Sequence, residues 1–366
     1  MNPEEYLKKI MPTRAEVDRF LSRDLFLDPG PNNHGWTHDA GLGWVLKDSA
    51  RDDGIDGSRT FYSYEPIGCR KRINCAGVPC RIHTYGDSFT HCDQVNDGET
   101  WEEYLAAHIR EPIMNYGVGG YGVYQAYLRM MRVEERERAD CVILNIWHDD
   151  HFRSLDSWRA IRFGFRTPCG FTLPYLEVDG KNGEAREHPN ICATPEEVYR
   201  LTDQDFVLRT FMEDRALRDM KARNHNVGRG GAYWRPTDME PKFIADALLA
   251  SRRIVEWCER ETARRVQKFM LVLSHGAEII KAELLGEPRW DATFVDAVRD
   301  KPYPVVDIRD AHRAEFAGMK IGVDEYLSRY YNGHYAPAGN YFFAQALRKR
   351  LVEWLEPRPE PYRRGR

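Results

Sequence analysis

Short apolar segments alternate with longer amphipathic ones between residues 78 and 355. Apolar residues recur at helical spacing in the longer segments. Strands that alternate with helices in this way predict an α/β domain, in which helices cover a parallel sheet. The expected strands are residues 80–85, 112–115, 141–147, 268–274 and 304–308, and the expected helices are residues 100–109, 123–136, 241–267 and 338–355.

Two regions depart from this alternation. Residues 1–77 contain a capping box at residues 13–16 and an aromatic segment at 59–64, which favour a helix start and a strand. We therefore expect an appended N-terminal subdomain rich in β-structure. Residues 152–240 are polar and contain prolines, which predicts an insertion with a helix beginning at Thr194. An insertion at the carboxyl edge of a parallel sheet commonly forms a lid or substrate wall, and structural filler is the alternative.

Composition limits the partners. The net charge is -4 and charges of both signs are interspersed, so no basic face is expected for a nucleic acid. No segment approaches the ~18 apolar residues of a membrane span, and no signal peptide is evident, which favours a cytoplasmic protein. The eight cysteines are scattered and show no paired motif, so we expect mostly buried thiols. Cys75 and Cys80 are close in sequence, but no second pair or neighbouring histidine completes a zinc site. The sequence indicates no cofactor, and it does not indicate the oligomeric state.

The C-terminal segment differs in composition from the rest of the chain. Residues 356–366, with three prolines and four arginines, predict a disordered tail.

A candidate nucleophile follows the first expected strand, which runs directly into Gly86, Asp87 and Ser88. A serine at this position projects from the carboxyl edge of the sheet, near the amides of the next helix, where negative charge is favoured. Residues 115–122 are rich in glycine, so their backbone amides can approach a reacting group and form part of an oxyanion hole. The lysine of a P-loop is absent there. His334 stands directly before the last expected helix, where the base for Ser88 would have to lie.

These segments, over residues 60–355 outside the insertion, resemble the SGNH (GDSL-type) hydrolase superfamily. The resemblance implies a flavodoxin-like parallel sheet sandwiched by helices. It implies Ser88 as nucleophile, His334 as base, and the backbone amides of Ser88 and Gly120 as oxyanion donors. A serine-dependent esterase or deacetylase acting on a carbohydrate-related or other small ester is the function that this resemblance favours.

Two residues differ from the pattern of that family. Asp149 stands where the family has an asparagine that donates to the oxyanion, and losing such a donor typically costs ~10² to 10³ in rate. Tyr331 stands where the family has an aspartate, three residues before the histidine. One interpretation is that Asp149 or Asp150 orients His334.

Other interpretations remain open. Asp149 could act on a glycosidic bond with a second carboxylate, for which Asp87, Asp150 and Asp324 are candidates. A non-catalytic carbohydrate-binding protein is a third possibility. Residues 148–151 also resemble a metal-ligand cluster, but consecutive side chains rarely converge on one ion, so no metal site is predicted. A polar loop that shapes the cleft is the plain alternative for this segment.

Several side chains are expected to bind the substrate. Asp87 adjoins the nucleophile, and aromatic residues lie near the predicted active edge, where their faces would suit sugar rings; packing in the core is the alternative for each of them. The aromatic candidates are Trp147, Tyr121 and Tyr335, with Trp158, Tyr124 and Trp290 nearby.

Overall fold

The computed structural model describes residues 2–22, 35–164, 170–180, 183–222, 236 and 239–363. Its centre is a five-stranded parallel sheet in the order β11-β10-β7-β5-β6. Numbered along the chain, these strands have the order 2-1-3-4-5, which is the flavodoxin-like arrangement. The predicted α/β fold is therefore confirmed, and each strand lies within its predicted segment. The strands are β5 (Ile82–Tyr85), β6 (Met114–Asn115), β7 (Cys141–Trp147), β10 (Lys268–Ser274) and β11 (Val305–Asp307).

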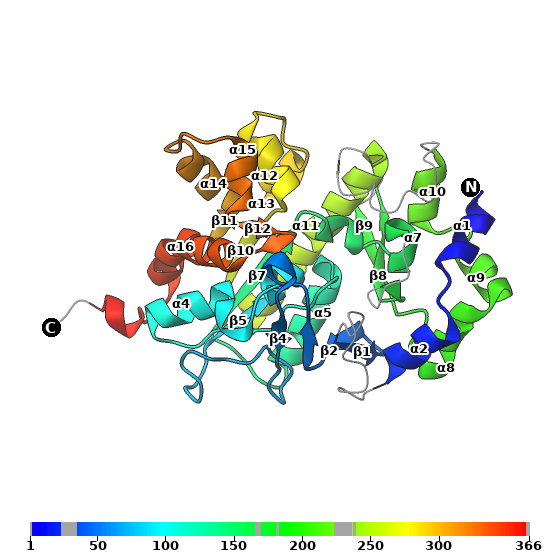
Figure 1. Ribbon diagram of the computed structural model, residues 1–366, viewed down its shortest axis with the longest axis horizontal. Coiled ribbons are helices and arrows are strands. Elements are labelled where there is room, and N and C mark those ends of the chain that lie inside the picture. The colour runs from blue at the N-terminus through cyan, green and yellow to red at the C-terminus, as the bar shows by residue number, and fades with distance from the viewer. Residues whose placement is uncertain are drawn as a thin grey trace.

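Helices cover both faces of this sheet (Figure 1). Alternate residues of β7 point to opposite faces, as the strand period requires. Val142 and Leu144 pack with α5 (Val123–Glu134) and α11 (Pro241–Arg264). Ile143 packs with α4 (Trp101–Ile109) and α16 (Pro337–Trp354) on the other face. Both faces are thus buried, which explains why β7 and β10 read as nearly continuous apolar segments.

Smaller elements follow the last two strands. Some of them surround a separate small apolar cluster that contains Ile280, Tyr326 and Leu327. A short hairpin then leads into α16. These elements are α12 (Ala277–Leu284), α13 (Ala292–Arg299), α14 (Ile308–Phe316), α15 (Val323–Ser328), β12 (Tyr331–Asn332) and β13 (His334–Tyr335).

The N-terminal segment contains two helices, α1 (Pro3–Ile10) and α2 (Arg14–Leu21), besides two antiparallel strand pairs. The predicted capping box is present, since the Thr13 side chain caps α2. The segment is therefore helical as well as β-structured. Its strands are β1 (Trp36–Asp39), β2 (Gly43–Leu46), β3 (Ser49–Arg51) and β4 (Thr60–Tyr62), and a 3₁₀ turn covers Ile55–Gly57.

The insertion and the N-terminal segment share one hydrophobic core. Tyr6, Phe20 and Trp44 of the N-terminal segment pack in one cluster with Trp158 and Phe211 of the insertion, and Figure 1 shows the two regions side by side. The predicted helix after Thr194 is α8. The elements of the insertion are α6 (Asp150–Arg153), α7 (Arg159–Phe163), β8 (Tyr175–Asp179), β9 (Glu184–His188), α8 (Pro195–Tyr199), a 3₁₀ turn (Arg200–Thr202), α9 (Gln204–Phe211) and α10 (Arg215–Ala222).

The expected disordered tail is corrected in part. Residues 356–363 lie against the domain: the Arg81 side chain donates to the carbonyl oxygen of Pro357 at 2.7 Å, and Glu360–Tyr362 forms a 3₁₀ turn. Residues 364–366 lie outside the described residues. Within the described ranges, every cysteine is a free thiol, and no helix has the length and apolar character needed to span a membrane.

Candidate active site

Ser88 is the first residue of α3 (Ser88–His91), directly after β5. The turn between them depends on Gly86, because a Cβ there would collide with Thr90 and with the carbonyl oxygen of Asn145. The Asp87 carboxylate accepts the backbone N–H of Phe89 at 2.8 Å and caps the helix. Strand, glycine and cap together fix the Ser88 hydroxyl at the carboxyl edge of the sheet.

The structure brings Ser88 and His334 together. Nε2 of His334 lies 2.8 Å from Oγ of Ser88, within hydrogen-bond distance, although the residues are 246 positions apart. His334 is in β13, and the hairpin with β12 holds it just before α16, whose first residue is Pro337. A serine hydroxyl and an imidazole nitrogen at this distance have the geometry of a nucleophile and its base.

Gln94 occupies the other side of the imidazole ring. Its Oε1 lies 2.9 Å from Nδ1 of His334 and accepts the His334 backbone N–H at 2.7 Å. The Gln94 amide is fixed, since its Nε2 donates to the carbonyl oxygen of Asp53 at 3.0 Å. An acceptor at Nδ1 selects the tautomer that leaves Nε2 free to take the Ser88 proton. The expectation that Asp149 or Asp150 orients His334 is therefore corrected.

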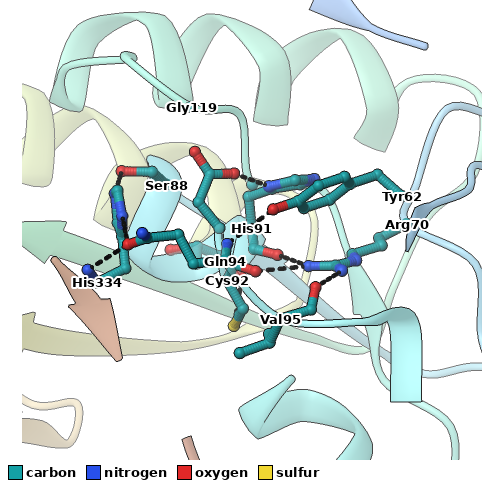
Figure 2. A network of polar contacts seen from close by, with 12 residues as sticks. Tyr62, Arg70, Ser88, His91, Cys92, Gln94, Val95, Gly119 and His334 are labelled. Atoms are coloured by element: carbon teal, nitrogen blue, oxygen red, sulfur yellow. Dashed lines mark hydrogen bonds and ion pairs between the residues drawn. The ribbon is translucent and has the colours of Figure 1, made fainter. Parts of the chain in front are cut away.

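The N-terminal segment holds Gln94 in place (Figure 2). The Gln94 backbone N–H donates to the hydroxyl of Tyr62 at 2.8 Å, and that hydroxyl donates to the Asp53 carboxylate at 2.9 Å. Gln94 has a φ of 73°, an unusual conformation for a residue other than glycine. The Arg70 guanidinium fixes this turn by donating to three of its carbonyl oxygens, those of His91, Cys92 and Val95, at 2.5–2.7 Å.

A buried histidine–aspartate pair lies beside the dyad. Nδ1 of His91 is 2.5 Å from Oδ1 of Asp93, and its Nε2 is 2.6 Å from the hydroxyl of Tyr64. Burial lowers the pKa of His91 to about 4. Burial by itself would raise the pKa of Asp93, but His91, Arg51 and His334 oppose it and hold that pKa well below its ordinary value. Asp93 is therefore a carboxylate at neutral pH.

Ser88 and His334 face a cavity of about 570 Å³. Three parts of the chain form its walls: the N-terminal segment, the carboxyl edge of the sheet and the insertion. The insertion contributes Arg153, Arg159 and Phe163, so this part of it is a wall of the cavity rather than filler. The lining residues are Trp36, Arg51, Ser88, Phe89, Asp93, Gly120, Trp147, Arg153, Arg159, Phe163, Gly276, Glu278, Gly333 and His334.

Gly120 and Trp147 were predicted as site residues and line this cavity. Gly120 has a φ of 81°, which a glycine adopts readily, and its carbonyl oxygen accepts a hydrogen bond from Arg159 at 2.5 Å. That bond fixes the orientation of the glycine turn. The Trp147 ring stacks on Phe89 at a centroid distance of 4.9 Å, so the cavity floor beside Ser88 is aromatic.

Asp149 lies outside the cavity lining, in a buried cluster of arginines and aspartates. Its carboxylate is 2.8 Å from Nε of Arg153 and 2.6 Å from Nη1 of Arg162. Burial would raise the pKa of Asp149, but the two arginines outweigh it and lower that pKa far below its ordinary value. The prediction of Asp149 as an accessible acid, base or nucleophile is corrected, because both guanidinium groups already engage it. Asp324 is on the surface, paired with Lys281 at 2.6 Å.

Asp87 and Asp150 also belong to this cluster. Nη1 of Arg153 is 3.0 Å from Oδ2 of Asp87 and 3.1 Å from Oδ1 of Asp150. Burial, together with the charge of Asp87, raises the pKa of Asp150 well above its ordinary value. Burial also raises the pKa of Asp87, against the opposing charge of Arg153. Asp87 is completely buried and caps α3, so the expectation that it binds substrate is corrected.

Most of the aromatic candidates pack in the core. The hydroxyl of Tyr121 donates to the carbonyl oxygen of Trp44 at 2.5 Å, and the side chain is fully buried. The hydroxyl of Tyr335 accepts from Tyr331 at 2.9 Å and lies 3.2 Å from His312. The expectation that Tyr121 and Tyr335 contact substrate is corrected, since neither side chain reaches the cavity.

No metal centre is evident within residues 2–22, 35–164, 170–180, 183–222, 236 and 239–363, where no three histidine, cysteine or acidic side chains could hold an ion together. The side chains of residues 148–151 do not converge on one point, and the two histidines among them have different neighbours. Nε2 of His148 lies 2.9 Å from Oε1 of Glu278, whereas His151 packs against the rings of Trp290 and Phe294.

No protein-family model and no curated protein matches this sequence. Solved structures that resemble the chain include a lipolytic protein of the G-D-S-L family from Desulfitobacterium hafniense, with 12% identity over 74% of this chain and 99% of that one, at a TM-score of 0.36. The acetylxylan esterase Axe2 from Geobacillus stearothermophilus shows 13% identity over 75% of this chain and 95% of that one, at a TM-score of 0.40. The α/β hydrolase LAE5 from the Lake Arreo metagenome shows 12% identity over 75% and 96%, at 0.38. Because the sequence identity is this low, these similarities do not identify a reaction for this chain.

Proposed function

We propose that this protein is a serine hydrolase that cleaves a small ester, with Ser88 as nucleophile and His334 as general base. The observation that carries the proposal is the 2.8 Å separation of Ser88 Oγ and His334 Nε2 at the wall of a cavity. The cavity volume of about 570 Å³ suits a small-molecule substrate.

In the proposed reaction, the Ser88 oxygen attacks the acyl carbon of the ester while His334 Nε2 takes the hydroxyl proton. The backbone amides of Ser88 and Gly120 donate to the oxyanion that forms. The imidazolium then returns its proton to the leaving alcohol, and an acyl-enzyme remains. Water, deprotonated by His334, attacks the acyl carbon and releases the acid and free Ser88.

Gln94 replaces the carboxylate that usually orients such a histidine. As a neutral acceptor it fixes the ring and the tautomer through Nδ1, at 2.9 Å. It carries no charge to stabilise the imidazolium. The Asp93 carboxylate, which interacts electrostatically with His334 from the adjoining position in the chain, supplies that negative charge.

The substrate that we propose is an acetylated carbohydrate or another small ester. Trp36, Trp147 and Phe163 give the cavity flat apolar walls suited to the faces of a sugar ring. The glycoside hydrolase alternative needs a pair of accessible carboxylates across the bond, and Asp149 is not one of them because Arg153 and Arg162 engage it.

Turnover of p-nitrophenyl acetate and of peracetylated xylose tests the proposal. Ser88→Ala and His334→Ala should each abolish hydrolysis above background while the thermal unfolding midpoint stays close to the parent value. Ser251→Ala is a matched control, since this buried α11 serine donates only within its helix, to Ala247 at 3.1 Å. Undiminished turnover by Ser88→Ala would disprove the serine mechanism. Ligand binding without turnover by the parent protein would favour the non-catalytic alternative.

A further inference from the structure

The proposed oxyanion hole is incomplete at one position. The SGNH pattern provides a side-chain amide there, but Asp149 has only acceptor oxygens, and both already accept from arginines. Two backbone amides, those of Ser88 and Gly120, are then the donors that remain in the proposed mechanism. A third donor near Ser88 would have to come from another residue.

Arg153 is placed to be that donor. It lines the cavity that holds Ser88 and His334, and it follows Asp149 by one helical turn. Oδ2 of Asp87 lies 3.0 Å from Nη1 of Arg153 and 3.3 Å from Oγ of Ser88, so guanidinium and nucleophile meet at a single carboxylate oxygen.

The Arg153 guanidinium is held rigidly. Its Nε donates to Asp149 at 2.8 Å, and its Nη1 donates to Asp87, Asp150 and the carbonyl oxygen of Tyr121 at 3.0–3.2 Å. Its plane also lies over the Trp147 ring, 4.7 Å from the centroid. Anchors on two edges and one face leave the group no freedom to rotate, which is the preorganisation that oxyanion stabilisation requires.

One edge of the guanidinium is not used by these anchors. Within the described part of the chain, Nη2 of Arg153 makes no hydrogen bond, whereas Nε and Nη1 make four. The neighbouring Arg159 differs, since its Nη1 and Nη2 both donate to carbonyl oxygens. The Arg153 Nη2 group is therefore a donor that the anchors do not use, on a side chain that lines the cavity.

We infer that Arg153 supplies the side-chain donor of the oxyanion hole, and that Asp149 holds it in position. This inference rests on the proposed function. A charge-assisted hydrogen bond from a guanidinium to an oxyanion is stronger than one from a neutral amide, so the arginine compensates for the missing asparagine. The aspartate that stands in place of the family's donor serves instead as the anchor of its replacement.

With Arg153 as the donor, restoring the family's asparagine at position 149 should lower the activity and not raise it. Asp149→Asn would raise activity if the asparagine itself donated to the oxyanion. With Arg153 as donor, the same change removes the anchoring charge from Nε and lowers kcat. Arg153→Lys, which keeps the charge but has no Nη2, should lower kcat on acetyl esters by ~10² with little change in KM, as the loss of an oxyanion donor does.

The matched control is Arg132→Lys. Arg132 forms a two-bond ion pair with Asp39 at 2.7 and 3.0 Å, and neither residue lines the cavity, so this variant should lower the unfolding midpoint while kcat stays near the parent value. A boronic acid, which forms a tetrahedral adduct with a nucleophilic serine, provides a second measurement. Arg153→Lys should bind it more weakly than the parent does, and should bind the alcohol product equally well.

Two outcomes would overturn the inference. The first is an Arg153→Lys or Asp149→Asn variant with parental kcat on neutral acetates. The second is a loss confined to KM and to substrates that carry an anionic group, which would make Arg153 a substrate anchor. The Ser88→Ala variant distinguishes failure of this inference from failure of the proposed function. If Ser88→Ala is inactive while Arg153→Lys keeps the parental kcat, only the role of Arg153 is rejected and the serine mechanism stands.

Discussion

Nδ1 of His334 lies 2.9 Å from the amide oxygen of Gln94, a neutral side chain in the place where a hydrolase histidine usually meets a carboxylate. Gln94 Oε1 also accepts the backbone N–H of His334, so one oxygen fixes both the main chain and the ring. The orientation of His334 therefore depends on a residue six positions after Ser88.

Removal of that acceptor should slow the reaction. Gln94→Ala leaves Nδ1 without a partner, so the ring can rotate and change tautomer, and kcat should fall by ~10², the lower end of what a positioned general base contributes. Gln94→Glu retains an acceptor and should keep more activity than Gln94→Ala. Gln345→Ala, which removes a glutamine bonded to His108 away from the cavity, is the control for a lost Gln–His contact. Equal activity of Gln94→Ala and the parent would exclude a positioning role.

The N-terminal segment should influence catalysis through Tyr62. Tyr62→Phe leaves the Gln94 backbone N–H without its acceptor, which should cost about 1–3 kcal/mol of unfolding free energy and lower kcat more than it changes KM. Urea unfolding and steady-state kinetics on an acetyl ester measure the two effects.

Tyr303→Phe provides the comparison, because the Tyr303 hydroxyl is buried without a hydrogen-bond partner among the described residues. That variant should be as stable and as active as the parent. A Tyr62→Phe variant that lost stability but kept full kcat would show that the N-terminal segment supports the fold alone.

Stability should decline in mild acid because of buried histidines. Burial lowers the pKa of His151 to about 3, against about 6.5 in an unfolded chain. Between these values the unfolded state binds a proton that the folded state does not, so the free energy of unfolding falls as pH falls. One such histidine accounts for about 2 kcal/mol between pH 6.5 and pH 5.

His151→Phe should remove that contribution, since an aromatic ring at this position keeps the contacts with Trp290 and Phe294. Urea unfolding at pH 7 and pH 5 should therefore show a smaller loss of stability for the variant than for the parent. An identical loss in both proteins would mean that His151 is not kept neutral by the fold.

The sequence predicted the parts of the fold that depend on local pattern. The five strands follow from apolar segments alternating with helices, and the proximity of Ser88 and His334 follows from their places at strand and helix ends. Trp147, at the end of a strand, was placed in the cavity for the same reason. The flavodoxin-like order of the strands was implied by the resemblance to the SGNH superfamily and not by the local pattern.

The parts that were wrong or missed depend on contacts between distant segments. Asp149 seemed a free carboxylate because its partners, Arg153 and Arg162, lie in an insertion that no motif describes, although the spacing of four residues to Arg153 suited a helical ion pair. Gln94 had no signal of its own, because its role depends on a left-handed φ and on Tyr62. Tyr121 and Tyr335 show that aromatic composition does not separate cavity from core.

Covalent labelling of Ser88 tests the central claim most directly. A fluorophosphonate reacts preferentially with an activated serine: the oxygen attacks phosphorus, fluoride leaves, and the phosphonyl group stays on the protein. Peptide mass spectrometry of the labelled parent should find the adduct on Ser88, and His334→Ala should label far more slowly because its hydroxyl has no base. An adduct on another residue, or none under conditions that label a control serine esterase, would contradict the assignment of Ser88 and His334 as a catalytic pair.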